Sequence, residues 1–316
     1  MTSSSSSRRP ARPARRRAPD PSGGHVTPYV VIAYVVSWGW LLPLVISGST
    51  VVAGTGWPTH FPALAGPLVA AVALTARREG RPGLRDLVRR MVSVRLPVRW
   101  WLFAVSPVLL VLCVFALDGL AGRPTPVLSD FAVFSGLPAQ WGVLPVAAAV
   151  FVVNGFGEET GWRGYALPHL QDRHSPLRAT LTLAAVWAGW HLPMFWLVDT
   201  FRSMGPVMVA GWVLGLGCGA VVLTWLYNRS GGSILLVATW HATYNLISGT
   251  RAATGLLAAA STTLVIVLAL ALVGLEIRGT RRGSPTILGP RPASGGGAAA
   301  ALSGPGVATV TRDLRP

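Results

Sequence analysis

The sequence contains no lysine, and it has few of several other residues that soluble proteins use freely. Only 12% of its 316 residues are charged, and only 11 are Asp or Glu. Soluble domains carry roughly 25% charged residues, so this composition argues against a soluble protein. The two cysteines, Cys113 and Cys218, both lie in apolar stretches. They provide neither a disulfide framework nor the spacing of a metal site.

Apolar residues, tryptophan and arginine are abundant instead. Hydrophobic residues make up 51% of the chain, 13 residues are Trp, and the net charge of +16 comes from arginine alone. The arginines lie in the two tails and between apolar stretches, which is how signals of membrane topology are distributed. We therefore expect a surrounding lipid bilayer and no nucleic-acid partner.

The apolar stretches predict an all-α, polytopic membrane protein. A membrane-spanning helix needs about 20 mainly apolar residues. On this basis we expect about eight spans, approximately at 27–47, 60–76, 100–120, 141–157, 177–198, 204–227, 232–248 and 255–276. Between the second and third spans, Leu84, Leu87, Val88 and Met91 recur at helical spacing beside arginines. This segment, 77–100, predicts an amphipathic helix on an anionic membrane surface.

The tails and the loop arginines predict the domain limits and the topology. Residues 1–26 and 277–316 lack a core-forming pattern and are expected to be disordered cytoplasmic tails flanking a transmembrane domain at 27–276. With both termini in the cytoplasm, the outer loops hold only Arg123, Arg202 and Arg251. Arginine used in place of lysine is typical of a GC-rich bacterial genome, so the expected location is the inner membrane of a bacterium.

The only adjacent acidic pair lies in the stretch NGFGEETGWRGYALPHL, at the predicted cytoplasmic end of the fourth span. In the simplest interpretation these are helix-end charges in the headgroup region. Glu159 and Arg163 are four residues apart, a spacing at which side chains meet on one helical face. Glu158 then points about 100° away, toward a different neighbour.

Two further apolar segments carry polar residues at membrane depth. His191 lies in the fifth predicted span, and His241 and Asn245 lie four residues apart in the seventh. One such histidine is commonly a satisfied interior residue. A set spread over three helices with a Glu pair instead predicts a shared polar cavity, because each group needs a partner in hydrocarbon. His25 and His60 belong to no such pattern.

Such a cavity is suited to hydrolysis by either of two chemistries. A desolvated carboxylate can act as a general base on water, while His and Asn can donate hydrogen bonds to an oxyanion. Alternatively, Glu158, His191 and His241 are the kind of residues that hold a catalytic zinc ion. No HExxH motif occurs. The spacing leaves both chemistries open.

The segments EETGWRG, WAGWH and HATYN, in this order, resemble the CPBP family, also called Abi, of CAAX-processing and bacteriocin-processing membrane endopeptidases. The family pattern is EExxxR, then FxxxH, then HxxxN or HxxxD, on separate transmembrane helices. The resemblance covers a core of about 141–250. The sequence departs from the pattern at Trp187, which stands in place of Phe. That change affects the shape of the pocket.

The resemblance implies a glutamic intramembrane endopeptidase that cleaves membrane-associated proteins or peptides near the cytoplasmic face. The catalytic residues that it implies are Glu158, Glu159, Arg163, His191, His241 and Asn245. Glu158 would activate water with His191, the second glutamate and the arginine would support the site, and His241 with Asn245 would form the oxyanion hole. In the mechanism that we favour no cofactor is required, with bound zinc as the alternative.

Two other functions remain as alternatives. A non-catalytic scaffold or bacteriocin-immunity protein would use the same polar core to bind a partner. A proton-coupled transporter would relay protons through the buried Glu and His residues. The absence of an inverted repeat in the sequence argues against a transporter.

Overall fold

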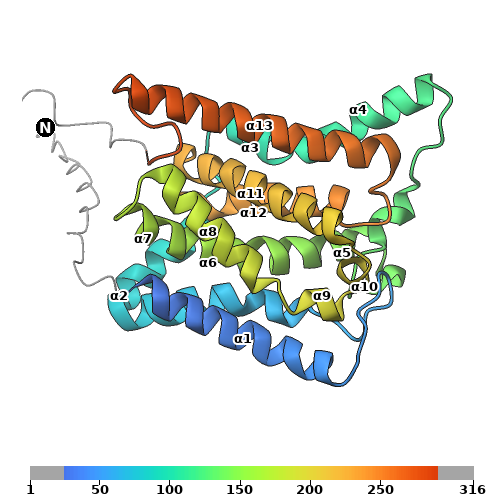
Figure 1. Ribbon diagram of the computed structural model, residues 1–316, viewed down its shortest axis with the longest axis horizontal. Coiled ribbons are helices and arrows are strands. Elements are labelled where there is room, and N and C mark those ends of the chain that lie inside the picture. Colours follow the sequence, from blue (N-terminus) through green and yellow to red (C-terminus); the bar gives the residue numbers. More distant parts are fainter. Residues whose placement is uncertain (1–24, 291–316) are drawn as a thin grey trace, which may run out of the picture.

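The computed structural model describes residues 25–290, and these residues form a bundle of helices (Figure 1). Its main helices are α1 (Val26–Ile46), α2 (Gly66–Val92), α3 (Val98–Ala104), α4 (Ser106–Leu120), α8 (Pro176–Trp190), α11 (Pro206–Arg229), α12 (Ile234–Ser248) and α13 (Gly255–Arg281). A further long helix, Val143–Gln171, comprises α5 (Val143–Ala149), η4 (Val150–Phe156), α6 (Gly157–Gly161), η5 (Trp162–Ala166) and α7 (Leu167–Gln171). In the described part of the chain, β-structure is limited to isolated bridges, so the all-α prediction is confirmed.

Several helices have the length and composition of membrane spans. Four helices are both long enough and apolar enough to cross a membrane: Val26–Ile46, Val143–Gln171, Pro206–Arg229 and Gly255–Arg281. The pair α3 and α4, bent by 59°, counts as a fifth if it forms one span. The other predicted spans fall on α2, which carries arginines in its second half, and on α8 and α12, which have 15 residues each. The protein is a multi-pass membrane protein, while the number of eight spans stays a prediction.

The second predicted span and the predicted surface helix are parts of one element. α2 continues through the arginine-rich segment and bends at Gly80, where the backbone has φ 60° and ψ −151°. Beyond the bend Leu87 is buried in the core, whereas Val88 is 53% exposed. This part of α2 is therefore amphipathic, and its position on a membrane surface stays a prediction.

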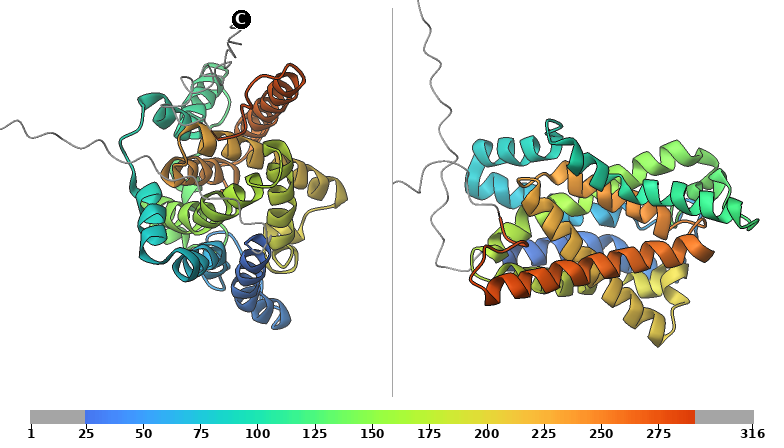
Figure 2. Two further views of the ribbon diagram at one scale, coloured as in Figure 1. Left: turned by 90° about the vertical axis from the view of Figure 1, so that its left-hand side faces the viewer. Right: turned by 90° about the horizontal axis from the view of Figure 1, so that it is seen from above.

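The Val143–Gln171 helix lies in the middle of the bundle. When the bundle is viewed along its axis, this helix has α1 and α2 on one side and α11 and α12 on the other (Figure 2, left). α4 and α13 lie at the periphery of the same view. The central position explains why the segment 157–167 of this helix is buried throughout.

The loops at the end of the bundle that holds α9 (Met194–Leu197) and α10 (Asp199–Arg202) are tied together. Isolated bridges pair Val51 with Val198, Ala53 with Ser135, and Phe134 with Thr250. The three arginines of the predicted outer loops also have partners here, since Arg123 bonds to Asp118, Arg202 to Thr50 and Arg251 to Asp130. The bond from Arg251 lowers the pKa of the Asp130 carboxyl. The three arginines in the predicted outer loops therefore help to hold those loops in place.

The C-terminal part of the described chain folds back onto the bundle. α13 extends to Arg281, and Leu288 is fully buried. The carboxylate of Glu276 accepts hydrogen bonds from the backbone N–H groups of Ile287 and Leu288, at 2.7 and 3.0 Å. Most of the two predicted tails, 1–24 and 291–316, lies outside the described residues.

Candidate active site

The two adjacent glutamates lie in the interior of the Val143–Gln171 helix, and not at its end as predicted. They belong to the α-helical segment α6, between the π-helical segments η4 and η5. π-helical turns are rare and are frequently found at functional sites, since each one changes the direction of the side chains that follow. The helix therefore continues past the predicted boundary at 157, and both carboxylates lie inside the protein.

Small residues allow other elements to approach this helix closely. A Cβ atom on Gly155 would lie 2.9 Å from the carbonyl oxygen of Ala238 in α12. A Cβ atom on Gly157 would lie 2.8 Å from the carbonyl oxygen of Leu64 in η1 (Phe61–Ala65). Close backbone contact of this kind needs glycine. It excludes solvent, so Glu158 is 2% exposed and Glu159 is 0% exposed.

Glu159 forms the centre of a buried ion-pair network. Its Oε1 accepts a hydrogen bond from Nη1 of Arg163 at 2.8 Å, which confirms the pair predicted from their spacing. The same oxygen lies 2.8 Å from Nδ1 of His241. Arg163 is itself 0% exposed, so these are not helix-end charges in a headgroup region. The network joins the central helix to α12.

Glu158 has a different environment from its neighbour. Its Oε2 accepts a hydrogen bond from the indole Nε1–H of Trp187 in α8, at 2.8 Å. Within the described part of the chain, Oε1 of Glu158 makes no hydrogen bond. The two carboxylates therefore have separate partners on separate helices, and one oxygen of Glu158 is left for a further ligand.

His191 lies just beyond the end of α8 rather than within a continuous fifth span. α8 ends at Trp190, and Pro193 follows in a turn, because proline cannot supply the N–H that a continuing helix needs. Nδ1 of His191 donates to the carbonyl oxygen of Trp187 at 2.7 Å. A carbonyl only accepts, so Nδ1 carries the proton and a neutral ring keeps Nε2 as an acceptor.

Asn245 lies on α12 one turn beyond His241 and is partly exposed. Its side-chain amide makes no hydrogen bond within residues 25–290. The structure thus joins Glu158, Glu159, Arg163, His191 and His241 through direct contacts or through Trp187. Asn245 is placed next to this group by the helix that it shares with His241.

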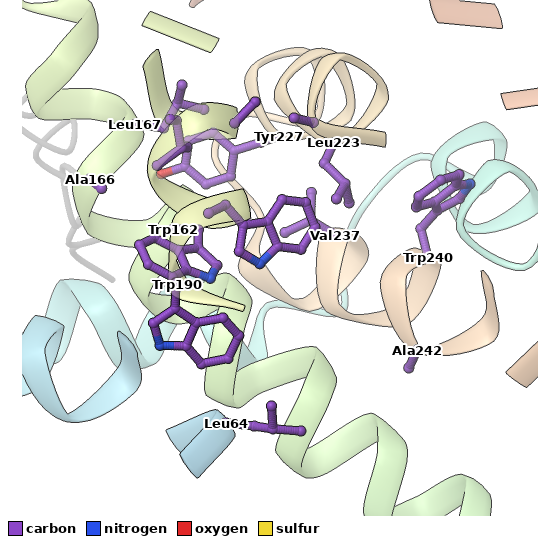
Figure 3. Close-up of a cluster of buried hydrophobic side chains, with 14 of the residues drawn as sticks. Leu64, Trp162, Ala166, Leu167, Trp190, Leu223, Tyr227, Val237, Trp240 and Ala242 are labelled. Atoms are coloured by element: carbon purple, nitrogen blue, oxygen red, sulfur yellow. The ribbon is translucent and has the colours of Figure 1, made fainter. Parts of the chain in front are cut away.

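Aromatic side chains pack around the polar group, and two of them, Trp162 and Trp190, are labelled in the buried hydrophobic cluster of Figure 3. Trp162 and Trp190 are fully buried, with ring centroids 5.8 Å apart. Trp190 is in turn 4.9 Å from the His191 ring, and Trp212 is 5.2 Å from it on α11. These rings limit the access of water to the carboxylates.

Two residues of the site were not predicted from the sequence: His60, and Trp187 as a hydrogen-bond donor. Trp187 matches the aromatic position of a motif, which suggests packing and conceals its hydrogen bond. His60 precedes η1 in a loop without periodicity, yet it is 6% exposed. It lies within electrostatic range of His191. Only the tertiary structure brings this histidine to the site.

The zinc alternative requires Glu158, His191 and His241 to lie together as ligands of one ion. Among residues 25–290, no three His, Cys, Asp or Glu side chains form a group that could hold a metal ion. Glu158, His191 and His241 are therefore not arranged as a ligand set in this structure. No step in the mechanism below is assigned to a metal.

Comparison with known proteins gives two matches. Residues 140–247 match the model of a family described as type II CAAX prenyl endopeptidase Rce1-like. The chain is also 23% identical over 226 residues to "CAAX prenyl protease 2" of Methanococcus maripaludis. This alignment covers 68% of the present chain and 79% of the relative.

The family match contains all three motifs, from Glu158 to Asn245. Both matches are to CAAX prenyl proteases by their descriptions, and several helices of this chain are long and apolar enough to cross a membrane. Through this region, both matches support the resemblance to the CPBP family that the three motifs carry.

Proposed function

We propose that this protein is an intramembrane endopeptidase in which Glu158 is the general base. The observation that carries the proposal is the state of this carboxylate, which is buried, held at Oε2 by Trp187 and without a hydrogen bond at Oε1 in the described structure. A carboxylate in such a position can bind a water molecule and take its proton. His191, with Nε2 as an acceptor, orients the same water.

The reaction begins when the water oxygen attacks the carbonyl carbon of the scissile peptide bond. The water proton passes to Glu158, and the carbonyl oxygen becomes an oxyanion. The tetrahedral intermediate then collapses, the carbon–nitrogen bond breaks, and Glu158 returns the proton to the leaving amine. The products are a carboxylic acid and an amine, which exchange a proton to become a carboxylate and an ammonium group, and Glu158 is left ionised as it began.

His241 and Asn245 are the proposed oxyanion donors. Since Nδ1 of His241 donates to Glu159, the ring can offer Nε2–H only when both nitrogens are protonated. The Glu159 carboxylate favours that cation, and Arg163 balances the second carboxylate of the cluster. Two anions and two cations then form a neutral buried group, which reduces the cost of their desolvation.

The proposed substrate is a membrane-associated protein or peptide, cleaved near the cytoplasmic face of the inner membrane. The support for this orientation is that, of the many arginines, only Arg123, Arg202 and Arg251 fall in the predicted outer loops. Both termini then lie in the cytoplasm. The proposed reaction requires no cofactor.

The test compares the membrane proteomes of cells that carry the wild-type protein, no protein, or Glu158→Gln. We expect the same uncleaved precursors to accumulate in the last two strains. The purified wild-type protein should then cleave such a precursor, and purified Glu158→Gln should not. If Glu158→Gln restores the normal processing of membrane proteins and the wild-type phenotype to the deletion strain, the proposed catalytic function is wrong. A non-catalytic scaffold is then favoured.

A further inference from the structure

Trp187 contacts four residues of the candidate site, which lie on three other segments and just beyond the end of its own. Its Nε1–H donates to Oε2 of Glu158 at 2.8 Å, and its carbonyl oxygen accepts from Nδ1 of His191 at 2.7 Å. The guanidinium carbon of Arg163 lies 4.6 Å from the centre of its ring. The His241 ring meets it edge to face at 5.5 Å. Trp187 is 6% exposed, so these contacts occur within the core.

We propose that the indole N–H of Trp187 positions the Glu158 carboxylate for water activation. This inference rests on the proposed function and deepens it. Phenylalanine, which the family pattern has at this position, carries no donor. The chain therefore uses an interaction that the residue of the pattern cannot make.

The hydrogen bond has two consequences for the carboxylate. It fixes the plane of the group by occupying Oε2, so that Oε1 is presented to the water. It also stabilises the ionised form, which is the form that accepts a proton. Without it, the carboxylate can rotate, and a smaller fraction of turnovers starts from the productive orientation.

The surrounding charges do not replace this donor. The charged and titratable groups that act on Glu158 are Glu159 on α6, Arg163 on η5 and His241 on α12. Within residues 25–290, the side-chain hydrogen bonds of Arg163 and His241 are made with Glu159 and not with Glu158. Within residues 25–290, Trp187 provides the one hydrogen bond to the proposed base.

Two replacements of Trp187 separate the donor from the ring. Trp187→Phe keeps an aromatic ring and removes the N–H. Replacement of Trp187 by 3-benzothienylalanine, introduced by amber suppression, keeps the size of the indole and substitutes sulfur for the N–H. Both are made in the full chain, purified in detergent and assayed with the precursor that accumulates in Glu158→Gln membranes.

The expected result is a fall in kcat of about 10-fold in both variants, with KM changed less than twofold, because a hydrogen bond to a charged group is lost while the substrate contacts remain. The thermal midpoint of the benzothienylalanine variant should stay close to that of the wild type. A purely structural role of the ring would leave kcat intact in this isosteric variant.

Other outcomes distinguish this inference from the proposed function. If Glu158→Gln is inactive but the benzothienylalanine variant has wild-type kcat, the positioning role of the N–H is wrong and the proposed function stands. If Glu158→Gln cleaves the precursor at the wild-type rate, the proposed function fails and the inference fails with it. Reduced kcat in Trp187→Phe alone would assign the effect to ring size and would overturn the inference.

Discussion

The Oε1 atom of Glu159 lies 2.8 Å from Nδ1 of His241, although the two residues are 82 positions apart in the chain. This contact separates the roles of the adjacent glutamates. Glu159 bonds to Arg163 and to a proposed oxyanion donor, whereas Glu158 bonds to Trp187. Substitutions of the two carboxylates should therefore have different effects.

The first prediction concerns the stability of the buried cluster. Glu159→Gln leaves the buried Arg163 without its carboxylate partner, so we expect a loss of about 3–5 kcal/mol in the free energy of unfolding. Thermal unfolding in detergent measures this loss. The matched control is Glu158→Gln, which keeps an acceptor for Trp187 and should unfold within a few degrees of the wild type. Equal midpoints for Glu159→Gln and wild type would contradict the ion-pair assignment.

The second prediction concerns the oxyanion hole. Asn245→Ala removes an amide that makes no hydrogen bond elsewhere in the described structure. We expect kcat to fall about 100-fold, with little change in KM or in the thermal midpoint. Steady-state kinetics on the accumulated precursor provide the measurement. A fall in stability that accounts for the lost activity would assign Asn245 a structural role instead.

The third prediction concerns metal dependence. The proposed mechanism assigns no step to a metal, so the rate of purified protein should be unchanged after treatment with EDTA or 1,10-phenanthroline. Elemental analysis of active samples should give far less than one zinc per chain. Inactivation by chelators that added zinc reverses would refute this mechanism and favour Glu158, His191 and His241 as ligands.

The fourth prediction concerns the attachment of α2 to the central helix. Nη1 of Arg90 donates to the carbonyl oxygen of Gly164 at 2.9 Å and to the hydroxyl of Tyr227 at 2.8 Å. Arg90→Met should lower the free energy of unfolding by about 1–3 kcal/mol, because buried acceptors lose their donor.

Arg89→Met is the matched control for Arg90→Met. The Arg89 side chain is 71% exposed and pairs with Asp86, so its loss should cost less than about 1 kcal/mol. Chemical denaturation in mixed micelles compares the two variants. A larger loss from Arg89→Met would show that the inward contacts of Arg90 contribute little.

The fifth prediction concerns topology. In a background without Cys113 and Cys218, a cysteine at position 123 should react with a membrane-impermeant maleimide in intact cells. A cysteine at position 95 should react only after the membrane is opened. Labelling in the reverse order would mean that both termini lie outside the cytoplasm.

Features that depend on neighbours along the chain could be predicted from the sequence. Apolar length predicts helices, and each of the predicted spans does fall on helical segments. The pair of Glu159 and Arg163 was predicted because helix geometry alone brings residues four apart together. The three motifs predicted the resemblance that the family model later supported, since their residues can be read without a structure.

Features that depend on how helices pack could not be predicted in this way. Only the fold puts Trp187 within hydrogen-bond distance of Glu158 and moves His60 from an unpatterned loop into range of His191. The central helix continues through π-helical turns past its predicted end, so the glutamates lie within the helix and are buried in the protein. The sequence by itself determined the helices, their apolar faces and the local ion pair, because these follow from spacing along one helix. The tertiary structure decided which partner each carboxylate has, because that depends on the rotation and depth of separate helices relative to one another.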